Sequence, residues 1–67
     1  MNATEAIRSA MLELKSEGNT NPDFEYAWSK ISAWLIKAGY GSKYVLSGAR
    51  KIIKTEFGQL LQYLSSL

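Results

Sequence analysis

The sequence contains no cysteine and no histidine. Without thiols the chain forms no disulfide, zinc–thiolate site or thiol nucleophile, and without imidazole it lacks the commonest general base and metal ligand. No nucleophile with an adjacent base, no metal-ligand spacing and no glycine-rich phosphate loop appears in the remaining residues. We therefore expect a protein that is not an enzyme and that uses no cofactor and no metal.

Long apolar runs are also missing. The longest, Ala33 to Ile36, is far shorter than the roughly 20 residues that span a bilayer, and the N-terminus lacks the basic-then-apolar pattern of a secretion signal. With 67 residues, the chain is long enough for one domain at most. We expect a single cytoplasmic domain, residues 1–67, that makes no contact with a membrane.

The first helix is predicted over residues 3–17. Asn2 is a suitable N-cap, and Glu5, three residues later, completes a reciprocal capping box. Gly18 ends the segment. Its apolar residues recur at helical spacing, which predicts that one face is buried: they are Ala3, Ile7, Ala10, Met11 and Leu14.

The second helix is predicted over residues 22–38, after the loop GNTNPD. Asn21 is a suitable N-cap, and Pro22 suits the first helical position. Gly39 provides a left-handed stop. The apolar face expected here consists of Phe24, Ala27, Trp28, Ile31, Trp34, Leu35 and Ala38.

The third helix, predicted over residues 43–66 with Ser42 as its cap, has the strongest apolar periodicity. Gly48 is unfavourable inside a helix, so we expect the segment to bend or split there. The fold class is all-α, and the predicted architecture is a small three-helix bundle. The core is expected to contain Ile7, Leu14, Trp28, Ile31, Leu35, Ile53, Phe57 and Leu60.

The apolar stripe of the third helix continues to Leu67, beyond the reach of two shorter helices. We therefore expect weak self-association, with a homodimer formed through the C-terminal helix. The side chains expected to be exposed for this contact are Leu60, Leu61, Leu64 and Leu67.

The net charge of +2 is unevenly distributed. Residues 1–25 carry two cations and five carboxylates, and residues 26–67 carry six cations and one carboxylate. Helical spacing gathers the cations of the third helix on one face, which favours a small nucleic-acid-binding regulator, although the polar side of any packed helix is often basic. The residues expected to bind nucleic acid are Lys43, Tyr44, Ser47, Arg50, Lys51 and Lys54.

Two modes of nucleic-acid binding are compatible with this face. In a helix-turn-helix, Gly39 would lie in the turn and Val45 would anchor the second helix, while Leu35 departs from the small residue common where the helices cross. In single-strand binding, Tyr40 and Tyr44 are the aromatic residues close enough to the cations to stack on bases.

The alternative function is a small helical adaptor or inhibitor that covers a partner protein. The stretch LELKSEGNTNPDFEYAWSKISAWLI, which ends at Ile36, resembles the helix, loop and following helix of small bacteriocin immunity proteins. The resemblance implies a helical bundle that blocks a protein partner, but the first helix of that family's four-helix bundle is missing, so it assigns no residue roles. The partner-binding residues expected in this case are Trp34, Ile36, Tyr40, Leu61, Leu64 and Leu67.

Overall fold

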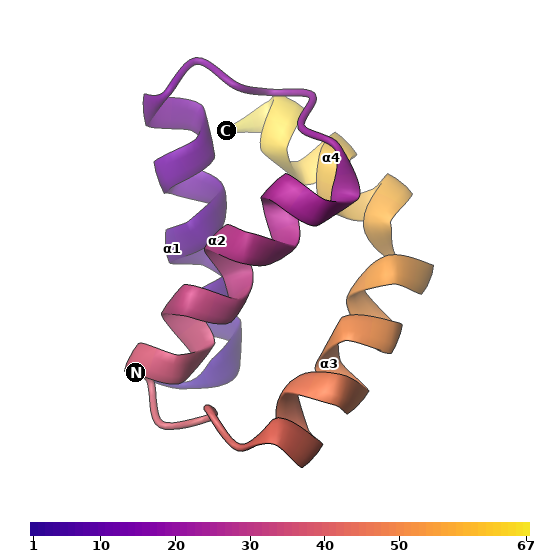
Figure 1. Cartoon of the computed structure of the whole chain (residues 1–67). Helices are drawn as coiled ribbons and strands as arrows, with labels where there is room; N and C mark the ends of the chain where they lie inside the picture. Colours follow the sequence, from indigo (N-terminus) through magenta and orange to yellow (C-terminus); the bar gives the residue numbers. More distant parts are fainter.

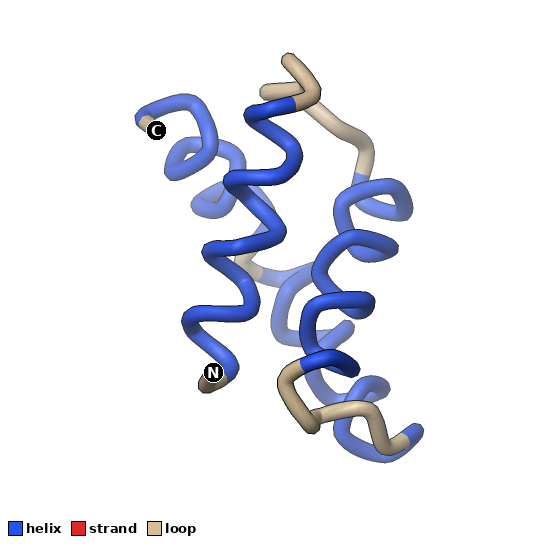
Figure 2. Tube along the Cα trace, turned by 90° about the vertical axis from the view of Figure 1, so that its left-hand side faces the viewer, coloured by secondary structure: helices blue, strands red, loops and turns tan.

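The computed structural model describes all 67 residues and consists of four α-helices joined by short loops (Figures 1 and 2). The helices are α1 (Ala3–Ser16), α2 (Phe24–Lys37), α3 (Lys43–Thr55) and α4 (Phe57–Ser66). The predicted all-α class is confirmed. The predicted number of helices is wrong, because the third predicted segment forms two helices rather than one.

Local signals determine where α1 begins. The Asn2 side chain accepts a hydrogen bond from the Glu5 amide at 2.8 Å, and the Glu5 carboxylate accepts one from the Asn2 amide at 2.9 Å. This is the predicted capping box, which satisfies two amides that have no partner within the helix. After α1 the chain turns at Gly18, whose φ of +75° lies in the left-handed region.

The start of α2 differs from the prediction. Asp23, rather than Asn21, is the N-cap, and its carboxylate accepts a hydrogen bond from the Tyr26 amide at 2.8 Å. Pro22 therefore lies before the helix, where it is buried. Both Asn21 and Asp23 are good capping residues, and the carboxylate also interacts favourably with the positive end of the helix.

The break between α3 and α4 lies at Glu56, and not near Gly48 as predicted. Length accounts for a break: at 1.5 Å per residue an unbroken helix over residues 43–66 would be about 36 Å long, whereas α1 and α2 are each about 21 Å long. The largest extent of the whole Cα trace is 29 Å. The turn at Glu56 lets α3 pack on α2 while α4 returns to pack on α1.

The core is formed mainly by α1 and α2. Four of the expected core residues, Leu14, Ile31, Leu35 and Ile53, are buried, and the other four are partly buried against them. Alanines complete the α1–α2 contact, because their small side chains let the two helices approach closely. Ala10, Met11 and Ala27, which belong to the predicted apolar faces, are also buried. The other buried residues are Ala6, Pro22 and Leu64.

The C-terminal leucines are not the exposed surface that was expected. Leu64 is completely buried, and the other three, Leu60, Leu61 and Leu67, are partly buried. The return of α4 onto α1 covers the apolar stripe that a single long helix would have left in water (Figure 2). The prediction of a homodimer through the C-terminal helix was based on exposed leucines, and these leucines are not exposed.

Candidate functional site

The basic residues expected to bind nucleic acid all lie on α3, the helix drawn in orange at the outer side of the molecule (Figure 1). Lys43, Ser47, Arg50 and Lys54 are spaced by four, three and four residues, so they follow one side of the helix. Arg50 is partly buried and the other three are exposed. The structure thus brings these four residues together as one basic flank of α3, and we use that name for them below.

Tyr44 and Lys51 lie beside the basic flank on the outward side of α3. They are seven residues apart, two helical turns, and both are exposed. The Tyr44 side chain is 89% exposed, the highest value among the large apolar or aromatic residues of the chain. An aromatic ring this accessible beside cations has the surroundings that stacking on a base requires.

The ring of Phe24, at the start of α2, contacts two cations of the basic flank. Its ring centroid lies 5.1 Å from the Arg50 guanidinium and 5.5 Å from the Lys54 ammonium, within the range of cation–π attraction. The same ring meets Phe57 of α4 edge to face, with 5.4 Å between the centroids. The two cationic heads therefore rest on a fixed aromatic ring at the α2–α4 contact.

Arg50 is the one member of the basic flank that has an acidic partner. Its guanidinium donates a hydrogen bond to the Glu25 carboxylate of α2. Lys43 and Lys54, like the neighbouring Lys51, form no ion pair. Three of the four cations on α3 are therefore free to meet an anion.

Glu13 and Glu17, at the C-terminal end of α1, pair with a cation of α2 and not with α3. Lys30 of α2 lies 2.7 Å from the Glu13 carboxylate and 2.7 Å from that of Glu17. The Trp34 indole donates to Glu13 at 3.0 Å, and the Tyr26 hydroxyl donates to Glu17 at 2.9 Å. We call these five residues the Lys30 network; it joins α1 to α2 and leaves the α3 cations unaffected.

The Lys30 network shifts the ionisation of its members. The hydrogen bond from Lys30, followed by that from Trp34, lowers the pKa of Glu13. The hydrogen bonds from Lys30 and Tyr26 lower the pKa of Glu17 in the same way. The pKa of Lys30 is raised by its hydrogen bonds to both carboxylates, Glu13 first. All three groups are therefore held in their charged forms.

A depression of about 440 Å³ lies beside the basic flank, between α3 and the middle of α2. Trp28 and Leu46 supply its apolar part, and the flank residues Lys43, Ser47 and Arg50 supply its polar part together with Gly41. The depression is shallow and open, and its lining is mainly apolar, with the three flank residues at its border. A backbone phosphate placed along this border would lie next to residues that carry an ammonium, a hydroxyl and a guanidinium.

The helix-turn-helix prediction does not fit the packing of α3. Val45, the residue predicted to anchor the second helix, is 42% exposed. Leu46, the next residue, turns towards Trp28 of α2 instead. Leu46 therefore faces α2 in the place where the motif requires Val45, so α3 presents a different side to α2 than the motif does.

Only one of the two tyrosines proposed for base stacking is accessible. Tyr40 is partly buried and lines an apolar pocket of about 170 Å³ between α1 and α3. Tyr44 projects from the first turn of α3 and is exposed. The cations and Tyr44 form one surface, and Tyr40 belongs to the core side.

The residues proposed for partner binding do not form one surface. Trp34 is partly buried and hydrogen-bonded to Glu13, with the Lys37 ammonium 4.9 Å from its ring centroid. Ile36 is exposed, on the side of α2 next to Gly41. Tyr40 is partly buried, as are Leu61 and Leu67, and Leu64 is completely buried.

The most exposed apolar surface of α3 was not among the expected site residues. Ile52 is 64% exposed and Val45 is 42% exposed. Seven residues apart, they share one side of α3 and line the 170 Å³ apolar pocket. The signal was present in the sequence, because apolar residues at positions 45 and 52 lie outside the stripe that includes Leu46 and Ile53.

No group of three or more carboxylates lies close enough to hold a metal ion. No helix has both the length and the apolar character needed to cross a bilayer. No protein family model matches the chain, and no curated protein or solved structure is significantly similar to it.

Proposed function

We propose that the protein is a non-catalytic, nucleic-acid-binding regulator that acts in the cytoplasm. The observation that supports the proposal is the charge arrangement of α3, where Lys43, Lys51 and Lys54 are exposed and free of ion pairs. Lys30 bridges Glu13 and Glu17, and Glu25 is the one carboxylate of the acidic half that pairs with an α3 cation, Arg50; the other three cations of α3 keep their charge unpaired. Binding needs no chemical step.

In the proposed mode the basic flank follows a phosphate backbone. Each ammonium that meets a phosphate releases condensed counterions, which favours binding at low salt. The first turn of α3 adds free backbone amides at the positive end of the helix. Ser47 and Tyr44 lie between the cations and can contact sugar or base. Arg50 binds the phosphate backbone only when a phosphate displaces the Glu25 carboxylate from its guanidinium.

A titration with labelled duplex and single-stranded oligonucleotides, at two salt concentrations, tests the proposal. The double variant Lys51→Gln/Lys54→Gln should weaken binding to every sequence and reduce the slope of log K against log salt by about 2 for a duplex, and by somewhat less for a single strand. Both side chains are exposed, so the helix content of the variant should be unchanged.

The control is Lys15→Gln, which removes one positive charge from the last turn of α1, away from α3. We expect this variant to bind almost as tightly as the wild type. Equal losses per charge removed for the α3 and α1 variants would reduce the proposal to a non-specific effect of net charge. Absence of binding at low salt would reject it.

A protein partner is the second candidate, as an adaptor or inhibitor. The observation that favours it is the exposed pair Val45 and Ile52, which presents more apolar surface than a helix facing water requires. Replacing Ile52 by Gln, which adds no charge, would weaken such binding without changing the salt dependence of oligonucleotide binding. An Ile52→Gln variant that loses oligonucleotide binding would instead show that Ile52 belongs to the nucleic-acid-binding surface.

A further inference from the structure

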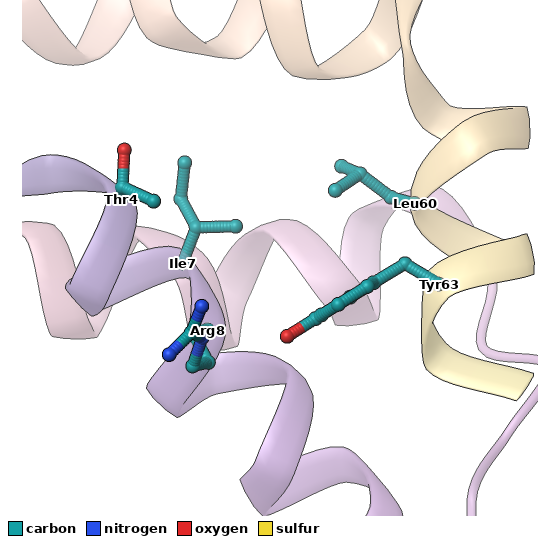
Figure 3. Close-up of a pocket in the computed structure, with 5 residues that line it drawn as sticks. All are labelled: Thr4, Ile7, Arg8, Leu60 and Tyr63. Carbon is teal, nitrogen blue, oxygen red and sulfur yellow. The ribbon is translucent and has the colours of Figure 1, made fainter. Parts of the chain in front are cut away.

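A pocket of about 250 Å³ lies between α1 and α4, on different helices from the basic flank (Figure 3). Thr4, Ile7 and Arg8 line it from α1, where their spacing places them on one face of the helix. Leu60 and Tyr63, one turn apart on α4, line it from the other side. The return of α4 onto α1 creates this pocket, so an unbroken third helix would not have formed it.

The pocket has an apolar floor; Thr4 adds a hydroxyl to its lining, and Arg8 and Tyr63 add two further polar groups. Ile7 and Leu60 are partly buried and pack against the core. Figure 3 shows the Tyr63 ring extending from α4 so that its hydroxyl points towards the Arg8 guanidinium of α1. The guanidinium is donor-only and the phenol can donate one proton. Both groups are therefore hydrogen-bond donors that face the same pocket.

Neither polar group is engaged within the protein. The three ion pairs of the structure involve Lys30 and Arg50, and none involves Arg8. The side-chain hydrogen bonds made by tyrosine, tryptophan and cationic side chains likewise exclude Arg8 and the Tyr63 hydroxyl. This distinguishes Arg8 from Arg50, whose guanidinium already has a carboxylate partner.

These properties determine the class of ligand. A guanidinium keeps its charge at any ordinary pH, and its planar fork matches a carboxylate. One cation balances a monoanion, whereas a phosphate dianion would need more donors and would leave the apolar floor unused. Drug-sized ligands occupy pockets of about 300 to 1,000 Å³, so the volume suits a smaller molecule.

We propose that the pocket between α1 and α4 binds a small monocarboxylate with an apolar body. The carboxylate accepts hydrogen bonds from Arg8 and from the Tyr63 hydroxyl, and the apolar body lies against Ile7 and Leu60. The proposal does not rest on nucleic-acid binding, because no residue of α3 lines this pocket. A free organic acid and the carboxyl end of an apolar peptide share the chemistry that would be recognised.

An NMR titration of the full chain with hexanoate tests the proposal, with the methyl groups of Ile7 and Leu60 as reporters. Hexanamide has the same size without the charge, and inorganic phosphate has charge without the apolar body. Hexanoate should shift both reporters saturably and bind at least about tenfold more tightly than hexanamide, as expected for a hydrogen bond to a charged group. Phosphate should leave both reporters unchanged.

Three variants identify the groups that bind. Arg8→Gln should weaken hexanoate binding by about tenfold and leave hexanamide binding unchanged. Tyr63→Phe, which removes only the hydroxyl, should weaken hexanoate binding by about threefold. Lys15→Gln removes a cation from the same helix outside the pocket, and it should change binding by less than about twofold. None should alter oligonucleotide binding.

The source of the ligand is distinguished by a parallel titration with N-acetyl-leucine, which represents the carboxyl end of a peptide. Tighter binding than hexanoate supports a peptide terminus, and weaker binding supports a free acid. Equal affinities for hexanoate and hexanamide, equal affinities for wild type and Arg8→Gln, reporter shifts caused by phosphate, or no saturable shift at all would each overturn the proposal.

Discussion

Leu64→Ala provides the most direct test of the way α4 packs. Leu64 is completely buried, so the substitution removes three carbon groups from the core at about 0.8 kcal/mol each, about 2.4 kcal/mol in total. The cavity left behind raises the expected loss to about 3 kcal/mol. A chain of 67 residues has about 3 to 10 kcal/mol of stability, so the substitution would remove a large part of it.

Urea unfolding followed by circular dichroism measures this loss. With a slope of about 1 kcal/mol per molar urea, as expected for a small protein, the midpoint should fall by about 3 M. Leu12→Ala is the matched control, because Leu12 lies on α1 and is about half exposed, and it should cost less than about 1 kcal/mol. If α3 and α4 formed one straight helix, Leu64 would lie in water and both variants would behave alike; that result would refute the packing of α4 on α1.

Three further outcomes follow from local features. Stability should fall as the pH drops below about 4.5. The lowered pKa values of Glu13 and Glu17 mean that both carboxylates lose their contacts with Lys30 only on acidification. Urea midpoints measured between pH 7 and 3 should therefore decline less in the Glu13→Gln/Glu17→Gln variant than in the wild type. Glu25→Gln should tighten oligonucleotide binding and increase its salt slope by about 1, because it frees the α3 guanidinium; weaker binding would contradict this. Gly48→Ala should stabilise the protein by about 0.5 to 1 kcal/mol, because the glycine is helical and an added Cβ meets no atom within 4 Å; thermal melting that shows a loss would count against the α3 helix.

Local signals predicted the starts of α1 and α3 and the turn after α2, but not the start of α2, where Asn21 and Asp23 are both good N-caps. The capping box at Asn2 involves residues three positions apart, and the cap at Ser42 accepts from the Val45 amide at 3.1 Å. Gly39, with φ of +97°, turns the chain after α2 as expected. Such features depend on a few neighbouring residues, which a sequence displays directly.

The break at Glu56 was not predictable from local preference. Glycine costs more than glutamate inside a helix, which pointed to Gly48, yet α3 passes through Gly48 without interruption. The position is set by packing, since α3 must stay against α2 while Leu64 reaches α1. Glu56, the residue at which the chain turns, is the only carboxylate of the predicted third helix.

The candidate site was predictable in part for the same reason. Helical spacing gathered the cations of α3 correctly, because the side of a helix on which a residue lies follows from its number. Their neighbours could not be predicted. Glu25 is 25 residues from Arg50, and the ring beneath the cations belongs to Phe24, so both contacts depend on how α2 and α3 cross.

The slight burial of α3 also has a consequence for its motions. Ile53 is its only buried residue, whereas α1 buries four, and a helix with few buried contacts opens at a lower free energy than the rest of a fold. The amides of α3 should therefore exchange with solvent hydrogen sooner than those in the middle of α1. A ligand held by the basic flank would slow that exchange, so protection of α3 amides would report binding even where no side chain shifts position.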